Sequence, residues 1–431
     1  METNSQSRFT VFIRKVSNVF REKGLLFSLK HAVKTGSLML WNLIRYSFQH
    51  RSYARYIRQL PFCDRVFLWK ENFGWNIALF QRPQHIARSL AKKGNTVFYY
   101  TSPEFDKDIT DIHQIEPNLY LVNRKNPVLL SMLERHLNQL SRHKYLHTYS
   151  TLGTPADELQ MYERHGFHVL YEYVDDLAPE LLRAQSASER LLQKFDYVTQ
   201  DNHIPIAVTA DLLKEQIVSR RGDKNLVQSS NGVDATHFRT IRNDFVFSDA
   251  FQTVLNRGNK IVGYYGAMAQ WMDYDLLKAV AQKLPGIDFV LIGKKYDDSY
   301  DVSGLDALAN VHFIGPVAYQ DLPQYASRFE LCTIPFKVNS ITNATSPLKL
   351  FEYMAMGKPV LTTAMKESSK YAAVNLATGA EEFADKILQL LEYTPETQPA
   401  YFALLEKTVE ENSWDAKTDL ILAMLSRFET A

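Results

Sequence analysis

The chain of 431 residues is 45% hydrophobic and 12% aromatic, a composition that fits a folded protein of about two or three domains and excludes a disordered chain. Its formal net charge is only +1, and no nucleic-acid partner is expected. The two cysteines, Cys63 and Cys332, are too far apart for a disulfide framework or a metal-ligand pair, which favours a reducing cytoplasm.

The start of the chain is basic and periodically apolar. Residues 1–60 contain eleven Lys or Arg residues and two Glu residues, a net charge of +9, with apolar residues at helical spacing between them. We expect residues 1–58 to form a basic amphipathic helical arm on the anionic inner face of the cytoplasmic membrane, which makes the protein cytoplasmic and peripheral. The most apolar run, 37–44, is too short to span a membrane. The alternative is a pair of ordinary helices packed on the body.

Strand and helix patterns alternate over the next part of the chain. A strand at 64–70, a helix from Pro83 to about Gly94 and a strand at 95–100 predict a βαβ unit. Further strands are predicted at 118–122, 168–176 and 197–201, with a helix at 180–194 and a turn at 230–234. This alternation predicts a Rossmann-like parallel-sheet domain over residues 59–245, which we assign to the acceptor.

A polar stretch at 239–259 precedes a second series of the same kind. The expected strands are 260–266, 287–292, 311–314, 331–336 and 359–363, and the expected helices are 274–284, 347–356 and 380–393. They predict a second Rossmann-like domain over 246–408, for the donor, and a helix at 409–431 that returns to the first domain. The predicted fold class is therefore α/β, with two parallel sheets that face a cleft at their carboxyl ends.

The segment 343–361 carries the clearest chemical signal. Ser346 is suited to cap a helix and Pro347 to begin it, so the free N–H groups and positive end of that helix predict an anion site. Lys349 in the first turn adds a full charge for a diphosphate, and Glu352 one turn deeper is suited to bind ribose hydroxyls. The alternative is a surface pair of Lys349 and Glu352 on a helix that buries its apolar stripe.

Glycines mark the same edge of the second predicted sheet. Gly263 and Gly266 are expected to flank the turn after its first strand, where backbone amides can approach a phosphate. Gly293, Lys294 and Thr345 are further candidates for the nucleotide site. Ordinary turn formation is the alternative for the glycines.

Other polar residues are candidates in the first domain. Arg82 and His85 begin a helix that faces the cleft, where they can contact phosphate, sugar or acceptor, although a single histidine there is more often structural. Asp175 and Asp176 end a strand, and either can deprotonate an acceptor hydroxyl if the reaction inverts configuration. The Asp273–Asp275 pair has the spelling of a metal motif, but it opens a helix and is interpreted as a cap.

Six segments together resemble the GT-B nucleotide-sugar glycosyltransferases, in particular the large retaining bacterial family that includes teichuronic-acid and other polysaccharide-assembly enzymes. The resemblance covers residues 64–431 and rests on the segments 82–94, 229–238, 263–277, 290–294, 310–336 and 346–360. It implies transfer of a sugar from a UDP- or GDP-sugar to an envelope, lipid-linked or polysaccharide acceptor. The helix start, Lys349 and the glycine loop are suited to stabilise the leaving diphosphate without a metal, and no cofactor is expected to be permanently bound.

The chain departs from that family at two places. Glu352 matches the second of two glutamates that the family places eight positions apart, but Ala344 stands at the first, which leaves the donor sugar and the stereochemical outcome open. The usual Arg and Lys after the first strand of the donor domain are missing, so Lys349 is expected to supply most of the charge, with Lys337 or Lys294. A catalytically silent nucleotide- or sugar-binding scaffold and a nucleotide-sugar epimerase of the same fold remain alternatives.

Overall fold

The computed structural model describes residues 50–71, 73–77, 80–102, 104–177 and 185–430. The predicted N-terminal arm lies outside these residues except for its last turns. Those turns belong to helix α3 (His50–Gln59), which packs on α5 (Pro127–Asn138) through Tyr53 and Ile57.

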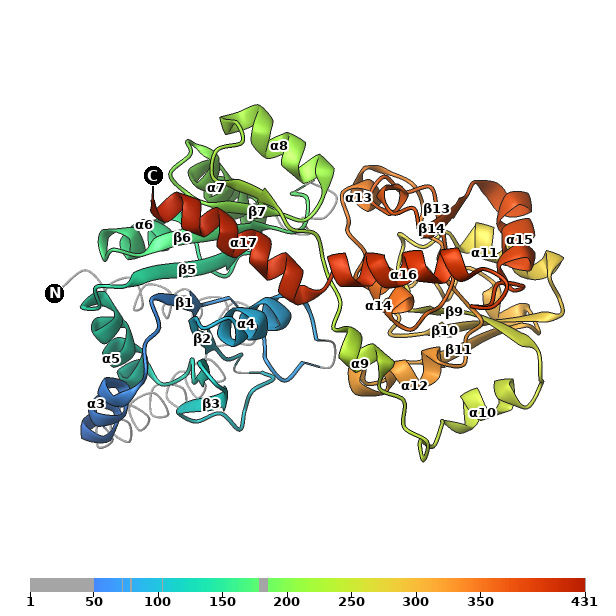
Figure 1. Ribbon diagram of the computed structural model, residues 1–431, viewed down its shortest axis with the longest axis horizontal. Coiled ribbons are helices and arrows are strands. Elements are labelled where there is room, and N and C mark those ends of the chain that lie inside the picture. The colour runs from blue at the N-terminus through green and yellow to red at the C-terminus, as the bar shows by residue number, and fades with distance from the viewer. Residues whose placement is uncertain (1–49, 72, 78–79, 103, 178–184, 431) are drawn as a thin grey trace, which may run out of the picture.

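The first lobe is built on an eight-stranded sheet of order β3-β4-β2-β1-β5-β6-β7-β8 (Figure 1). Every described pairing in it is parallel except that of β3 with β4. Its strands are β1 (Arg65–Trp69), β2 (Thr96–Tyr100), β3 (Ile112–Glu116), β4 (Leu119–Val122), β5 (His143–Tyr149), β6 (His168–Tyr173), β7 (Ile206–Val208) and β8 (Leu226–Gln228).

Both faces of this sheet are buried, which explains why its strands are apolar without strict alternation. In β1, Val66 and Leu68 belong to one core cluster, and Phe67 and Trp69 to the cluster on the other face. The helices that cover the faces are α3, α4 (Arg82–Lys92), α5, α6 (Ala156–Arg164), α7 (Gln185–Thr199) and α8 (Asp211–Arg221), together with α17 (Trp414–Glu429).

The second lobe contains a six-stranded sheet of order β11-β10-β9-β12-β13-β14, and its described pairings are all parallel. The strands are β9 (Lys260–Tyr265), β10 (Ile287–Ile292), β11 (Val311–Gly315), β12 (Leu331–Ile334), β13 (Val360–Thr363) and β14 (Val374–Ala377). The helices are α9 (Ala235–Arg239), α10 (Asp249–Leu255), α11 (Tyr274–Lys283), α12 (Leu322–Ala326), α13 (Ser340–Asn343), α14 (Leu348–Ala355), α15 (Gly379–Leu390) and α16 (Pro399–Glu411).

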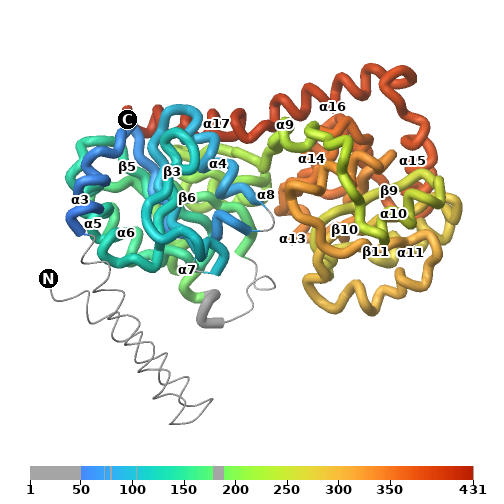
Figure 2. The backbone as a smooth tube through the Cα atoms, turned by 90° about the horizontal axis from the view of Figure 1, so that it is seen from below, coloured from blue at the N-terminus to red at the C-terminus, as the bar shows by residue number. Residues whose placement is uncertain are grey.

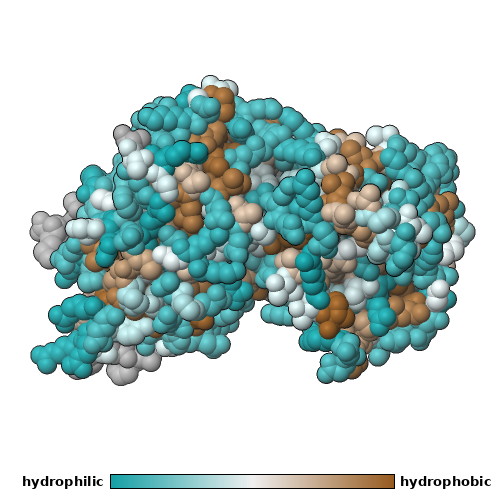
Figure 3. Space-filling model, in the orientation of Figure 1, coloured by the Kyte–Doolittle hydropathy of each residue, from teal (hydrophilic) through white to brown (hydrophobic). Residues whose placement is uncertain are grey.

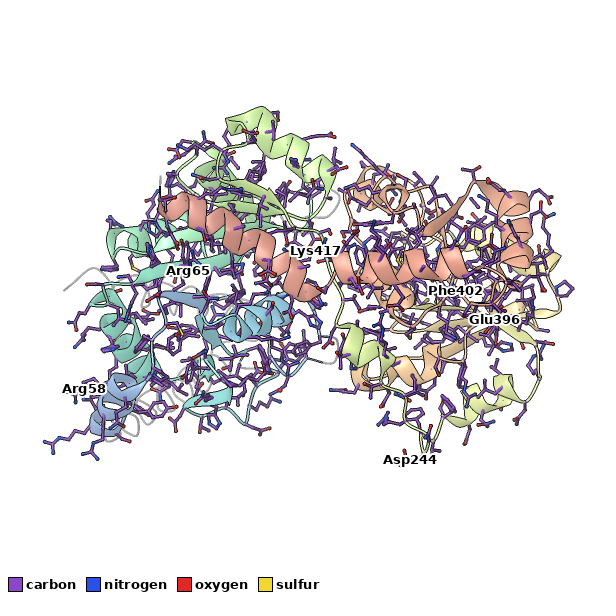
Figure 4. The ribbon with its side chains drawn as sticks, viewed as in Figure 1. Arg58, Arg65, Asp244, Glu396, Phe402 and Lys417 are labelled. Atoms are coloured by element: carbon purple, nitrogen blue, oxygen red, sulfur yellow. The ribbon has the colours of Figure 1, made fainter. Side chains whose placement is uncertain are left out.

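The chain passes between the lobes twice, and the two crossings lie side by side (Figures 1 and 2). The Val233 N–H donates to the Asn412 carbonyl at 3.0 Å, and the Trp414 N–H donates to the Val233 carbonyl at 3.3 Å. After the second crossing α17 runs back along the first lobe and packs on α4. Lys417 lies at this junction (Figure 4) and donates to Asn412 Oδ1 at 2.6 Å.

One predicted strand is wrong. Residues 197–199 belong to α7 rather than to a strand, and the strand of that region is β7, seven residues further on. Leu191, Phe195 and Val198 are spaced by four and three residues and are all buried, so the apolar period is that of a helix. No helix in the described part of the chain is both long and apolar enough to cross a membrane.

Candidate functional site

The beginning of α14 lies one residue later than the sequence suggests. Pro347 is the N-cap, with an extended ψ of 118°, and Leu348 is the first helical residue. Ser346 does not cap the helix, because its hydroxyl accepts the Asn231 N–H at 3.3 Å while its carbonyl accepts Asn231 Nδ2 at 2.7 Å. Proline has no side-chain acceptor, so the first N–H groups of α14 are left without a side-chain cap.

Lys349 lies beside these N–H groups without a counter-ion. Its ammonium is 5.5 Å from the ring centre of Tyr264 and 5.2 Å from that of Phe336, and no carboxylate of the described residues lies within ion-pair distance of it. Burial lowers the pKa of Lys349, and only the more distant charge of Glu352 opposes this shift. A partly desolvated cation beside a helix N-terminus has the charge and the N–H donors that an anion needs.

Two glycines bring backbone close to this lysine. Gly266 and Gly293 each have a φ of 147°, which side chains rarely allow. A Cβ on Gly293 would lie 1.8 Å from the Gly266 carbonyl oxygen, and one on Gly266 would lie 2.8 Å from Lys349 Cε. The loops after β9 and β10 therefore meet at Lys349 only because both residues are glycines.

Gly263 has a different role from the one expected. It lies inside β9 rather than at the turn, and a Cβ there would lie 2.0 Å from the Phe329 ring. Its missing side chain makes room for core packing. Lys294, directly after Gly293, is exposed, and its carbonyl accepts the Met268 N–H at 2.9 Å.

Glu352 is buried one turn further along α14. The Tyr265 hydroxyl donates to its Oε2 at 2.8 Å, and burial raises the pKa of Glu352, opposed by this hydrogen bond and by Lys349. The two side chains form no ion pair, so the surface-pair alternative is wrong. The sequence analysis did not identify Tyr265 as a site residue, although its position between Gly263 and Gly266 could have indicated it.

The segment before α14 faces the first lobe. Ala344 is buried in the apolar cluster on one face of the first sheet, at the position where the family places a glutamate. The Thr345 hydroxyl donates to the Ile341 carbonyl at 2.9 Å, which closes the short helix α13. Ser346 and Asn231 join the lobes directly, and no sequence signal had marked Asn231 as such a contact.

Arg82 is buried and fully engaged in the first lobe. Its guanidinium pairs with Glu172 and donates to the Ser230 carbonyl at 3.0 Å and the Ser229 hydroxyl at 3.2 Å. Burial alone would raise the pKa of Glu172, but Arg82 and His147 hold it at about 2. Arg82 thus supports the loop between the lobes directly before Asn231, which contacts Ser346.

His85 lies in the contact between the lobes. Its ring stacks on Trp414 with centres 4.8 Å apart, and its Nε2 lies 3.5 Å from the Tyr319 hydroxyl of the second lobe. Burial lowers the pKa of His85 to about 3, so the ring is neutral at ordinary pH. These contacts favour a structural role for His85.

Asp175 and Asp176 follow β6 and differ in their surroundings. Asp176 Oδ1 accepts from the Tyr173 hydroxyl at 3.2 Å and from Gln216 Nε2 at 3.3 Å. The Asp175 carboxylate is exposed and accepts no hydrogen bond from the described residues, yet the surrounding protein raises its pKa by desolvation. Of the two, Asp175 is the carboxylate available to a ligand.

The structure thus gathers Gly266, Gly293, Ser346, Lys349 and Glu352 around the start of α14. Pro347 and Thr345 directly precede this helix, whereas Gly263 lies inside β9 and the Lys294 side chain is exposed. Arg82, His85, Asp175 and Asp176 belong to the first lobe. Asp273 caps α11, as expected, by accepting the Leu276 N–H at 3.0 Å. Among the described residues no group of three His, Cys, Asp or Glu side chains is placed to hold a metal. An indentation lies between the two lobes at the lower edge of the molecule in Figure 3.

Known proteins share this architecture. Residues 259–393 match the family model described as Glycosyl transferases group 1. TuaH of Bacillus subtilis (strain 168), named as a proposed teichuronic acid biosynthesis glycosyltransferase, is 26% identical over 190 residues, which are 43% of this chain and 45% of TuaH. The match therefore spans less than half the length of that curated relative.

Two solved structures align with most of this chain. Anabaena HepE in complex with UDP aligns with a TM-score of 0.56 and 16% identity, over 84% of this chain and 100% of HepE. A UDP-forming trehalose-phosphate synthase from Burkholderia xenovorans aligns with a TM-score of 0.57 and 11% identity, over 86% of this chain and 100% of the synthase. The two-domain α/β fold and the resemblance to GT-B glycosyltransferases are confirmed.

Proposed function

We propose that the chain is a glycosyltransferase that moves a sugar from a nucleoside-diphosphate donor to an envelope, lipid-linked or polysaccharide acceptor. The observation that carries this proposal is the unpaired Lys349 beside the uncapped start of α14, with Gly266 and Gly293 in contact with it. Such a site fits a diphosphate, whose negative charge increases as the sugar leaves. The match of residues 259–393 to group 1 glycosyltransferases supports it.

The donor is proposed to be a UDP-sugar. Glu352 lies one turn from Lys349, at a spacing that suits the ribose of a nucleotide whose diphosphate is at the start of α14. Solved HepE structures carry UDP and UDP-glucose, and this supports uridine over guanosine as the base here.

The proposed reaction needs little covalent participation by the protein. The acceptor oxygen forms a bond to the anomeric carbon, the bond from that carbon to the diphosphate oxygen breaks, and its electron pair leaves with the nucleotide. Lys349 and the α14 N–H groups stabilise the departing charge. In a transfer that inverts configuration, Asp175 takes the proton of the attacking hydroxyl, because its carboxylate is accessible and its raised pKa makes it a better base than an ordinary aspartate.

The acceptor is proposed to be reached from a membrane surface. The charge of +9 over residues 1–60 and the exposed Arg51, Arg55 and Arg58 of α3 support attachment of this end of the protein to anionic lipid. Arg58 is labelled in Figure 4. A cytoplasmic, peripheral location on the inner leaflet is part of the same proposal.

A nucleotide screen tests the proposed function. The thermal midpoint of the full-length protein is measured with UDP, GDP, UDP-glucose, UDP-N-acetylglucosamine, UDP-glucuronic acid and GDP-mannose, and the best ligand is then assayed for nucleotide release with a bacterial lipid extract. We expect a uridine nucleotide to raise the midpoint, and nucleotide release to depend on the extract. If no nucleotide shifts the midpoint and none is released, the proposed function is wrong.

A further inference from the structure

A buried ion pair fixes the loop that follows β5. Glu71 and Lys194 are almost completely buried, with Lys194 Nζ 3.6 Å from Glu71 Oε1. Glu71 accepts hydrogen bonds from the hydroxyls of Thr148 and Thr151 and, at 3.2 Å, from the Tyr149 N–H. Lys194 donates to the carbonyls of Tyr149 at 2.7 Å and Thr151 at 3.1 Å. The residues on both sides of position 150 are therefore held by charged groups.

Close packing adds to this restraint. A Cβ on Gly153 would lie 1.9 Å from Glu71 Oε2, so the loop lies directly against the carboxylate. Buried charges are expensive unless they are paired and hydrogen-bonded, and this pair has partners for both of its members. The loop after β5 is thus a rigid part of the carboxyl edge of the first sheet.

Ser150 lies in this loop and contacts the end of β6. Its buried hydroxyl oxygen accepts the N–H of Val174 at 3.2 Å and the N–H of Asp175 at 3.3 Å. One oxygen thus binds two successive N–H groups of the segment that presents the Asp175 carboxylate. The carboxylate itself has no hydrogen-bond partner among the described residues, so its position depends on its backbone.

We propose that Ser150, held by the Glu71–Lys194 pair, is a positioning residue that fixes Asp175 for contact with the acceptor hydroxyl. The inference rests on the proposed function, because it assumes that Asp175 meets the acceptor. Nothing in the sequence pattern marks Ser150, since its role depends on two neighbouring strands. Its effect passes through the backbone of Asp175 and needs no contact between Ser150 and the substrate.

The test compares Ser150→Ala with Ser150→Thr and Asp175→Asn in full-length protein. Nucleotide release from UDP-glucose with a bacterial lipid extract is measured from about pH 4 to pH 9, and UDP binding is measured in parallel. We expect Ser150→Ala to lower turnover by about 10-fold or more, with Asp175→Asn lower still and Ser150→Thr close to wild type. UDP binding should be unchanged in all three. Ser248→Ala, which removes a serine cap from the distant α10, is the matched control.

The pH profile separates positioning from a general structural effect. A base acts when it is deprotonated, so release falls as the pH drops through the pKa of Asp175. Without Ser150 the segment that carries Asp175 is held less closely against the surrounding protein, so the raised pKa of the Asp175 carboxyl should return toward its ordinary value. The acid limb of Ser150→Ala should therefore move to lower pH. The inference fails if Asp175→Asn is inactive while Ser150→Ala has wild-type turnover, or loses turnover with no movement of the acid limb of its pH profile.

If Asp175→Asn is fully active, the proposed role of Asp175 as a base is wrong and the inference about Ser150 fails with it, although the glycosyltransferase assignment stands. If the wild type releases no nucleotide from any of the screened nucleotide sugars, both fail.

Discussion

Lys349 is the residue on which the proposed donor site depends most. Its ammonium has no described counter-ion and is held between the rings of Tyr264 and Phe336, so its charge is available to a ligand. We expect Lys349→Ala to weaken UDP binding about 10- to 100-fold, the range for loss of a charge-assisted hydrogen bond. Titration calorimetry measures this effect. Lys407→Ala, which removes an exposed lysine of α16, is the matched control and should bind UDP as the wild type does.

Glu352 is expected to favour UDP binding while it lowers the stability of the folded protein at high pH. Burial raises its pKa, so the stability associated with its neutral form is complete below the ordinary pKa of glutamate and is lost as the pH rises through the raised value. At pH 8 the free energy of unfolding of Glu352→Gln should therefore equal that of the wild type or exceed it by about 1 kcal/mol. At pH 4 the variant should be no more stable than the wild type. UDP binding should fall. Urea unfolding at the two pH values measures the first effect, and a clear loss of stability at pH 8 would contradict it.

Gly293 provides a test of the backbone geometry. A methyl group there would lie 1.8 Å from the Gly266 carbonyl oxygen, in a conformation that alanine rarely adopts. We expect Gly293→Ala to lower the free energy of unfolding by about 1–3 kcal/mol and to abolish nucleotide binding. Gly286→Ala is the control, because a Cβ at Gly286 would meet nothing within 4 Å. Equal stability of the two variants would show that the loops after β9 and β10 can move apart.

At the scale of elements, α11 shows how an acidic motif is used. Asp273 is its N-cap, with its carboxylate on the Leu276 N–H, so one of the two carboxylates of the metal-like pair is already committed to the helix. We expect nucleotide release to survive EDTA, and Asp273→Ala to lower the free energy of unfolding by about 0.5–2 kcal/mol. Loss of release with EDTA and its return with manganese would contradict this interpretation.

The N-terminal arm is testable at the same scale. Tyr53 and Ile57 of α3 are buried against the first lobe, so the truncation has to end before His50. Removal of residues 1–49 leaves only Arg51, Arg55 and Arg58 of the basic stretch, and should therefore strongly weaken binding to anionic liposomes while UDP binding stays unchanged. High salt should weaken attachment of the full-length protein only in part, because salt screens charge but leaves apolar insertion intact. If the full-length protein does not bind anionic liposomes, the membrane interpretation is wrong and the alternative, helices that pack on the body of the protein, is favoured.

The sequence alone was enough to predict the features that depend on residues within one short segment. The proline, lysine and glutamate of α14 lie within one segment, so the helix and its position at a sheet edge could be read directly. The function of Gly263 could not, because the Phe329 ring that fills its place comes from 66 residues later in the sequence. Residues 197–199 were mistaken for a strand because β-branched and aromatic residues favour strands, while burial against the sheet follows the helical period.

At the scale of the whole molecule, the two lobes are joined by charge as well as by the chain crossings. Glu367 of the second lobe accepts the Asp211 N–H at the start of α8 at 2.7 Å, and Lys370 lies 2.7 Å from the Asp211 carboxylate. Asn231 and Ser346 make a second contact between the lobes, directly before α14. The proposed donor site and the sheet edge that carries Asp175 thus belong to one framework, which is the arrangement that transfer between two substrates would need.

The most direct test is transfer itself. Full-length protein is incubated with radiolabelled UDP-sugars and a bacterial lipid extract, and label in the lipid phase is counted for wild type, Lys349→Ala and Asp175→Asn. The account predicts label with the wild type, a large loss with Lys349→Ala together with weaker UDP binding, and a large loss with Asp175→Asn while UDP binding is retained. Transfer at the wild-type rate by Lys349→Ala would contradict the account.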